Sequence, residues 1–408
     1  MYNILILIES INPDDSSGIK GRLALINNLI KIGHQVKVIY LDENYTNDEN
    51  FEAEVIGRFP SSIYFWLSKF NTFAKKFGIR LNKWVEPQLG FSFSHYEDVD
   101  RFKKTLARDK PENYDIVFTL SKAASFRSHK AILESPKWQR KWYAYVHDPY
   151  PMHAYPRPYD WVEPGHHKKR NFFLGVCDKA YKLVYPSLLL AEWMESYYHN
   201  SEHKRLIIPH QIDKTVNIAE INEYFSKSTF TILHAGSLMS ARKPYALVNA
   251  FLKLKQEFPE LKNNSNLLFV GSKSCFHDYF VKVSQQHPEL IYTSEAIPFS
   301  EVLRLQMDAS VNVILEAKGP VSPFLPGKFS HCVMAKRPIL LLGPYYSEAK
   351  RLLNGDEYPY WSEIDDKDSI FRVLKTIYMS WKTGTTNFKY FKLKNYLSLD
   401  YLIENFKL

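Results

Sequence analysis

Aliphatic runs alternate with helical patterns from the start of the chain. Ile4–Ile8 is a continuous aliphatic run, which is typical of a parallel strand buried on both faces. The apolar positions within Leu23–Ile30 are spaced by three and four, which predicts a helix that ends at Gly33. Val36–Leu41 has a second strand pattern. The order strand, helix, strand predicts the right-handed crossover of an α/β sheet.

The same alternation continues in two blocks. Residues 42–113 interrupt the rhythm and are predicted to hold extra helices, and the polar stretch 209–228 is predicted to be a linker. Further strands are predicted at 115–120, 142–146, 181–185, 206–208, 230–235, 267–271, around 291, and at 311–315 and 338–343. Further helices are predicted at 122–135, 187–198, 244–258, 299–309, 326–335, 346–354, 367–382 and 393–408.

This pattern predicts an α/β protein with two Rossmann-like, doubly wound parallel-sheet domains that face a cleft. In open α/β sheets, ligands bind beyond the carboxyl ends of the strands, at the point where the strand order reverses. We therefore expect the functional residues of this chain to lie directly after predicted strands.

Composition narrows the class of protein. The 408 residues are 45% hydrophobic and 24% charged, which excludes a mainly disordered chain. Lys and Arg exceed Asp and Glu by 53 to 44, and 15% of the residues are aromatic. A basic, aromatic-rich surface suits phosphate-bearing partners. Residues 1–210 carry a net charge of +5 and the rest +4, so neither half is a dedicated polycation and no nucleic-acid partner is expected.

Three features favour a cytoplasmic protein, either free or bound to the inner face of the cell membrane. The three cysteines are far apart and form no CxxC pair, which argues against a disulfide framework or a zinc site. The N-terminus has no basic segment and no cleavage signal of a secretory peptide. No apolar run approaches the ~20 residues that span a bilayer.

Two segments of the first half could carry chemistry. Gly18 opens the first predicted helix, where it would let a ligand approach the backbone, or it is a plain loop glycine. The surrounding loop lacks GxGxxG, which disfavours a dinucleotide site. His147 and Asp148 follow a predicted strand and precede a proline- and aromatic-rich loop. The pair could orient a hydroxyl group or act as acid and base, or the loop is an ordinary surface loop with a structural histidine.

Two segments of the second half predict an anion site. After the strand at 230–235, Gly236 begins a turn that carries Arg242 and Lys243 to the start of a helix, which together could cradle a diphosphate. Lys328 likewise stands at the start of a predicted helix, where a cation is unfavourable unless an anion is present.

Two other motifs were weighed. The segment Phe65–Trp84 is aromatic and basic, and it is either a helix that lies on an anionic membrane surface or a packed helix with solvated lysines. The triplet Asp98-Val99-Asp100 is interpreted as a helix N-cap rather than a metal site. His147 and His153 lack a third ligand at convincing spacing, so no metal is expected.

These segments resemble the large retaining family of GT-B fold glycosyltransferases that includes bacterial mannosyl- and glucosyltransferases building cell-surface glycans. Ile4–Gly33 resembles the family's strand, glycine loop and helix. Ala235–Phe251 resembles its G-x(5)-R-K stretch, and Pro326–Leu340 its P-x-K-x-x-E-x(6)-P-I segment. The resemblance implies that residues 1–212 form an acceptor-side domain, joined by a C-terminal helix at 386–408, and that residues 213–385 form the nucleotide-sugar-binding domain.

The resemblance also implies roles for individual residues. Gly18, Arg242, Lys243 and Lys328 would face the donor diphosphate, and His147 and Asp148 would be catalytic. The nucleoside would be bound by Gly236, Ser237, Ile297, Pro298, Glu316 and His331. The chain departs from the family where an acidic pair is usual, because Pro323 stands seven residues after Glu316 and His331 aligns with the ribose-binding acid.

The implied activity is hexosyl transfer, with retention, from a nucleotide sugar to a hydroxyl group of a glycan or lipid-linked acceptor in surface polysaccharide synthesis. No cofactor and no metal are expected, since the donor is a substrate and cations and helix N-termini would stabilise the leaving diphosphate. Two alternatives stay open. One is a nucleotide-sugar 2-epimerase on the same fold, and the other is a non-catalytic nucleotide- or sugar-binding protein.

Overall fold

The computed structural model divides into two units, each described by itself. Unit 1 comprises residues 1–155, 159–211 and 402–408, and unit 2 comprises residues 156–158 and 212–401. Most of the predicted linker, residues 213–217 and 221–227, lies outside the described residues, and so does the start of the predicted closing helix, residues 386–389. The structure describes residues 1–13, 15, 17–45, 51–199, 201–212, 218–220, 228–385 and 390–406.

Unit 1 contains a seven-stranded sheet in the order β3-β2-β1-β4-β5-β6-β7, with parallel neighbours throughout. The order reverses between β1 and β4, which places the switch point of the sheet there. The strands are β1 (Asn3–Ile8), β2 (Gln35–Tyr40), β3 (Glu52–Val55), β4 (Ile116–Leu120), β5 (Trp142–Tyr145), β6 (Lys182–Tyr185) and β7 (Arg205–Ile207).

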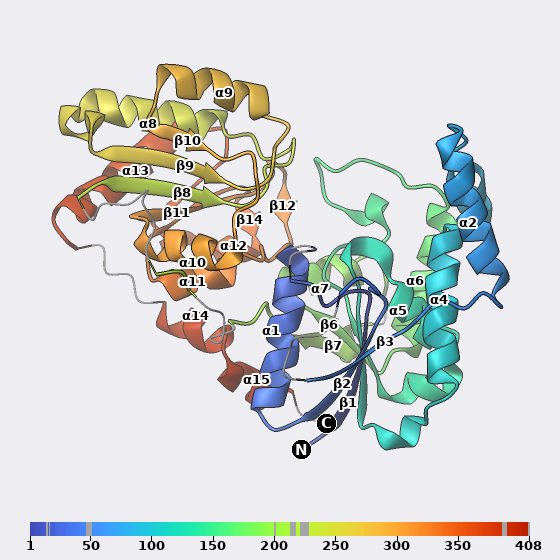
Figure 1. The fold of residues 1–408 in the computed structure, drawn as a ribbon. Coiled ribbons are helices and arrows are strands. Elements are labelled where there is room, and N and C mark those ends of the chain that lie inside the picture. The colour runs from blue at the N-terminus through green and yellow to red at the C-terminus, as the bar shows by residue number, and fades with distance from the viewer. Residues whose placement is uncertain are drawn as a thin grey trace. The chain divides into compact units, whose positions relative to one another are not determined.

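Helices cover both faces of this sheet (Figure 1). Alternate residues of β1 point to opposite faces. Ile4, Ile6 and Ile8 join a core with helix α1, and Leu5 and Leu7 join a second core with α4 to α7. The helices are α1 (Ser17–Lys31), α2 (Ile63–Lys76), α3 (Asn82–Leu89), α4 (Phe93–Leu106), α5 (Arg127–Leu133), α6 (His166–Lys179) and α7 (Leu188–Glu195).

Unit 2 contains a six-stranded parallel sheet in the order β10-β9-β8-β11-β13-β15, which reverses between β8 and β11. A small two-stranded sheet pairs β12 with β14. The strands are β8 (Phe230–Ala235), β9 (Ser265–Val270), β10 (Leu290–Tyr292), β11 (Val311–Leu315), β12 (Val321–Ser322), β13 (Ile339–Leu342), β14 (Tyr346–Ser347) and β15 (Trp361–Ser362).

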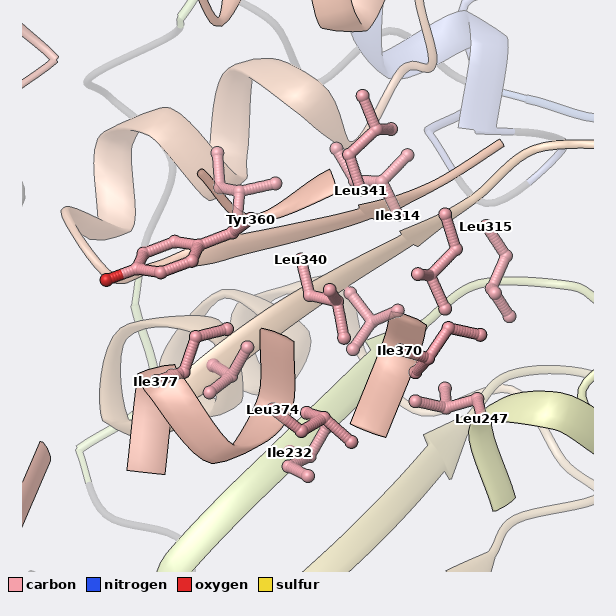
Figure 2. Close-up of a cluster of buried hydrophobic side chains, with 14 of the residues drawn as sticks. Ile232, Leu247, Ile314, Leu315, Leu340, Leu341, Tyr360, Ile370, Leu374 and Ile377 are labelled. Carbon is pink, nitrogen blue, oxygen red and sulfur yellow. The ribbon is translucent and has the colours of Figure 1, made fainter. Parts of the chain in front are cut away.

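The core of unit 2 is aliphatic. Figure 2 shows Ile232 and Leu340 from the central strands beside Leu374 and Ile377 of α13, and all four side chains are inaccessible to solvent. The apolar period in each helix produces this packing, because it places one face against the sheet. The helices are α8 (Tyr245–Glu257), α9 (His277–Gln286), α10 (Phe299–Asp308), α11 (Phe329–Ala335), α12 (Glu348–Leu352), α13 (Lys367–Lys382) and α14 (Phe391–Tyr396).

The C-terminal segment returns to unit 1 within helix α15 (Leu399–Asn405), from Leu402 onward. Phe406 packs among aromatic side chains of unit 1, with its ring centroid 5.6 Å from that of Phe118 and 5.8 Å from those of His34 and Tyr143. Aromatic packing of this kind ties the end of the chain to the first sheet.

Several local predictions were wrong. The helix predicted at 346–354 begins as strand β14, and only Glu348–Leu352 is helical, with the Ser347 hydroxyl accepting from the N–H of Lys350. The helix predicted at 326–335 begins at Phe329, so Lys328 is its N-cap residue. Helices α6 and α9 were missed.

The Asp98-Val99-Asp100 triplet is not an N-cap. It lies inside α4, whose N-cap is Ser92, and its carboxylates pair locally. Asp98 binds Arg101 and Arg127, and Asp100 accepts from the Ser62 hydroxyl at 2.7 Å. The triplet therefore holds α4 to its neighbours.

Candidate functional site

The residues that directly follow the central strands of unit 2 are small or acidic. Gly236 follows β8, Gly271 follows β9, Glu316 follows β11 and Gly343 follows β13. Because these strands are parallel neighbours around the point where the order reverses, the four residues lie at the edge where α/β sheets bind ligands.

Gly236 makes room for the ammonium group of Lys328. Its φ of +133° is a conformation that side chains disfavour, and a Cβ atom there would lie 2.7 Å from Lys328 Nζ. Behind it, a Cβ atom at Gly271 would lie 2.9 Å from the carbonyl carbon and oxygen of Gly236. Gly271 therefore allows the turn after β8 to pack against the backbone after β9, and Gly236 allows that turn to contact Lys328.

His234 of β8 holds Lys328 in place. Its Nδ1 lies 3.1 Å from the Val313 carbonyl oxygen, which can only accept, so Nδ1 carries the proton. Burial lowers the pKa of His234 well below its ordinary value, which keeps the ring neutral. The remaining nitrogen, Nε2, accepts a hydrogen bond from Lys328 Nζ at 3.3 Å. His234 was missed from the sequence because it resembles an ordinary residue of a buried strand.

Lys328 and Arg242 form a cationic pair at this edge. Burial, and then the charge of the nearby Arg242 guanidinium, lower the pKa of Lys328 to about 7. Arg242 Nε is buried and has no hydrogen-bond partner within the described ranges. The adjacent Lys243 is exposed. Neither Lys328 nor Arg242 forms an ion pair with a carboxylate in the described part of the chain, so an anionic ligand could supply the partner.

Glu316 lies at the same edge and is almost fully buried. Its Oε1 accepts from the Ser322 hydroxyl at 3.1 Å, whereas Oε2 has no hydrogen-bond partner in the described part of the chain. Burial raises the pKa of Glu316 to about 7, against the opposing effects of the Ser322 hydroxyl, the Ser347 hydroxyl and the Arg242 charge. Gly343 is packed against this side chain, because a Cβ atom there would lie 2.7 Å from Glu316 Oε2.

Three of the other predicted nucleoside-binding residues, Ile297, Pro298 and His331, form a second group in unit 2. Ile297 packs against the core between β8, β9 and α10, and Pro298 is the N-cap residue of α10. The next residue, Phe299, lies with its ring centroid 4.9 Å from that of His331 on α11. Phe299 was missed from the sequence, although its position directly after Ile297-Pro298 was a signal. Ser237 is exposed and bonds the Ser272 hydroxyl at 2.8 Å.

Unit 1 has its own polar cluster at the carboxyl ends of its strands. His147 follows β5, with Nδ1 3.5 Å from the Ser121 hydroxyl and Nε2 3.3 Å from the Asp148 carboxylate. Burial, and then the charge of Arg22, lower the pKa of His147 well below its ordinary value, so the ring is a neutral base. Arg22 of α1 is itself buried.

Glu9 and Gly21 complete the unit 1 cluster and were missed from the sequence. Glu9 directly follows β1 and accepts from the N–H of Lys122 and the hydroxyl of Ser125, which bridges the strands at the switch point. A Cβ atom at Gly21 would lie 3.2 Å from His210 Nδ1. The predicted Gly18 lies in the first turn of α1.

The structure thus brings the predicted residues together in two sets. Gly236, Arg242, Lys328 and Glu316 gather at the strand ends of unit 2, and Ile297, Pro298 and His331 gather around Phe299 in the same unit. Gly18, His147 and Asp148 belong to unit 1. Among the described residues, no group of three or more His, Cys, Asp or Glu side chains is arranged to hold a metal ion.

The two doubly wound parallel sheets define the class: the chain has the GT-B fold of two Rossmann-like domains. Similar solved structures include the UDP-forming α,α-trehalose-phosphate synthase of Burkholderia xenovorans in complex with glucose-6-phosphate (TM-score 0.63, 11% identity, covering 99% of this chain and 98% of that one). They also include trehalose-6-phosphate synthase of E. coli with UDP-2-fluoro glucose (0.60, 11%, 99% and 96%) and S. aureus MnaA with UDP (0.51, 11%, 95% and 92%). No protein-family model and no curated protein matches the chain.

Proposed function

We propose that this protein is a glycosyltransferase that moves a hexosyl group, with retention, from a nucleotide sugar to a hydroxyl group of a glycan or lipid-linked acceptor in surface polysaccharide synthesis in the cytoplasm. The observation that carries the proposal is the half-buried cationic pair of Lys328 and Arg242 beside Gly236, at the switch point of unit 2. The similar GT-B structures that contain UDP or a UDP-sugar analogue support the choice of ligand.

The chemistry follows from where negative charge develops. When the bond between the sugar and the diphosphate breaks, the leaving group gains negative charge, and preorganised cations lower the energy of that state. Lys328 and Arg242 would supply this charge without a metal ion. A bound diphosphate would also raise the pKa of Lys328 and return its proton, because an anion favours the charged form.

Glu316 and His147 would take the roles that involve protons and hydroxyl groups. Within the described ranges, Oε2 of Glu316 has no hydrogen-bond partner. With a pKa of about 7, the carboxyl group can hydrogen-bond a ligand hydroxyl as donor or acceptor. His147 is a neutral base whose Nδ1 lies within hydrogen-bond reach of the Ser121 hydroxyl. Its Nε2, 3.3 Å from the Asp148 carboxylate, has no hydrogen-bond partner among the described residues, which suits a group that polarises an acceptor hydroxyl.

The proposal is tested by incubating the full chain with UDP-, GDP- and ADP-sugars, with and without glycan acceptors, and by following nucleotide release and product formation. Glycosyltransfer predicts release of a nucleoside diphosphate that requires an acceptor. Conversion of the nucleotide sugar without an acceptor would identify an isomerase such as the 2-epimerase, and binding without turnover would identify a binding protein. Failure of every nucleotide to bind would reject all three.

Donor binding should weaken as the pH rises above neutrality. Lys328 is charged below its pKa of about 7, so the affinity for the donor is highest at pH values below 7. Above pH 7 the affinity should fall by up to about tenfold per pH unit, until the pH exceeds the higher pKa that Lys328 has in the donor complex. Binding titrations with a nucleotide sugar from about pH 6 to about pH 9 measure this dependence. A nucleotide sugar is the suitable ligand because it has no phosphate monoester, whose own pKa of about 6 would add a second pH effect. Lys328→Met should remove the Lys328 part of this slope and leave only the part contributed by Glu316, which lies at the same edge and has a pKa of about 7. The charged and titratable groups around Lys328 are Arg242, His234 and Cys332, and burial keeps the latter two neutral in this range.

His147→Ala should lower the rate of sugar transfer about 10²–10⁴-fold and leave donor affinity unchanged, because it removes the neutral base of unit 1. Single-turnover rates and calorimetric donor titrations separate the two effects. His129→Asn is a matched control, since His129 is also a buried histidine of unit 1 but bonds the Tyr145 carbonyl oxygen. A His147→Ala protein with full transfer activity would remove His147 from the mechanism.

A further inference from the structure

Helix α2 is amphipathic in the reverse of the usual sense. Its buried residues are Phe65, Ser68, Asn71 and Ala74, so a largely polar and small face packs inward. The Ser62 hydroxyl that precedes the helix bonds Asp100 of α4, and Figure 1 shows α2 beside α4. The inward face of α2 therefore packs against the rest of unit 1, and the outward face is exposed to solvent.

The outward face of α2 is an aromatic stripe. Ile63, Trp66, Phe70, Phe73 and Phe77 follow one another at alternating spacings of three and four, which places them on one side of a helix. Each is 58–69% exposed. Single exposed apolar residues are ordinary, but a contiguous row of five marks an interaction surface.

The stripe continues into α3, which buries none of its residues. Trp84 is 78% exposed and Ile79, between the two helices, is 53% exposed. A helix without buried residues gains little from the protein core. Its exposed tryptophan is of the type that sits at membrane–water interfaces, where one edge of the ring is apolar and the other wet.

The positive charge around the aromatic stripe indicates a negatively charged partner. Residues 61–85 contain five basic residues and no acidic residue. The five are all exposed and are Lys69, Lys75, Lys76, Arg80 and Lys83. A second copy of this face would bring like charges together, which opposes dimerisation through it. Anionic lipid headgroups offer the complementary charge, and the acyl boundary accepts the aromatic rings.

We propose that α2 and α3 form a membrane-docking surface, which lies flat on an anionic bilayer with its aromatic stripe in the interface and its lysines and arginine on the headgroups. Helix α2 has 14 residues, fewer than the ~20 that span a bilayer. Within the described ranges, no helix is both long and apolar enough to cross one. The inference needs no sugar transfer and stands apart from the proposed enzymatic activity.

Flotation of the full chain with lipid vesicles tests this surface. The protein should float with vesicles that contain about 30% phosphatidylglycerol and should not float with pure phosphatidylcholine, because the attraction is partly electrostatic. Phe70→Ser with Phe73→Ser, and separately Lys69→Glu with Lys76→Glu, should each lower the bound fraction about tenfold or more. Val281→Ser with Lys282→Glu, an exposed pair on α9 of unit 2, is the matched control and should float like the parent protein.

Two results would overturn the docking surface. One is absence of flotation with anionic vesicles, and the other is flotation that the α2 variants leave unchanged. A dimer that the Phe70→Ser, Phe73→Ser variant dissociates, in a protein that does not float, would assign the stripe to self-association instead. Nucleotide affinity, measured on the same variants, should be unchanged, which shows that they fold and separates this test from that of the diphosphate site.

Discussion

Lys328→Met is expected to weaken nucleotide-sugar binding about hundredfold while leaving the protein folded. A charge-assisted hydrogen bond contributes about 1.5–3 kcal/mol, and loss of about 2.7 kcal/mol corresponds to a hundredfold change. Methionine keeps most of the buried stem but removes the ammonium group. Burial lowers the pKa of this lysine in the folded state, so its charged form destabilises the fold at neutral pH. The substitution should therefore leave the unfolding temperature unchanged or raise it.

Calorimetric titration measures the change in nucleotide-sugar affinity, and thermal unfolding measures the change in stability. Lys243→Met is the matched control, because Lys243 follows Arg242 directly but is exposed. We expect that variant to lose no more than a few-fold in affinity, as befits a solvated charge. Equal losses in both variants would show that binding depends on general positive charge rather than on Lys328 in particular.

Gly271→Ala is expected to cost about 1–3 kcal/mol of folding stability and to weaken donor binding tenfold or more. The added Cβ atom would lie 2.9 Å from the carbonyl carbon and oxygen of Gly236 and 3.3 Å from the N–H nitrogen of Ser237. These are backbone atoms, which cannot rotate away as a side chain can. The turn after β8 must therefore shift, and with it the contact between Gly236 and Lys328.

Gly327→Ala is the matched control for this glycine, since a Cβ atom there would meet no heavy atom within 4 Å. Its stability and donor affinity should stay near those of the parent protein, although it adjoins Lys328. Chemical denaturation and donor titration of the two variants give the comparison. A Gly271→Ala protein of parental stability and affinity would show that the packing of the two turns is unimportant.

The alternation of aliphatic runs with helical periods was enough to predict the fold class, because buried parallel strands such as Ile4–Ile8 have an unambiguous pattern. Elements without a clear apolar pattern were missed for the opposite reason. Strand β15 has only two residues, and the hydrophilic start of α6, His166–Arg170, resembles a loop. Strand β14 was absorbed into a predicted helix, since its two residues carry no period.

The candidate site was only partly predictable, because its properties depend on contacts across long stretches of chain. The glycine and cations of the turn after β8 could be picked out from their local pattern. The hydrogen bond between His234 and Lys328 joins residues 94 positions apart, and the burial of Glu316 depends on Gly343 of the neighbouring strand end. Likewise, the period of α2 predicted a helix with an aromatic face, but only the structure shows that this face points outward.

The central claim is that the strand ends of unit 2 hold the diphosphate of a nucleotide sugar. A crystal structure of the protein with UDP-glucose, or with whichever nucleotide sugar binds, tests it most directly. The account predicts diphosphate oxygens within about 3 Å of Lys328 Nζ and of the Arg242 guanidinium, with Gly236 against the ligand. A nucleotide bound elsewhere, with Lys328 still bonded only to His234, would contradict it.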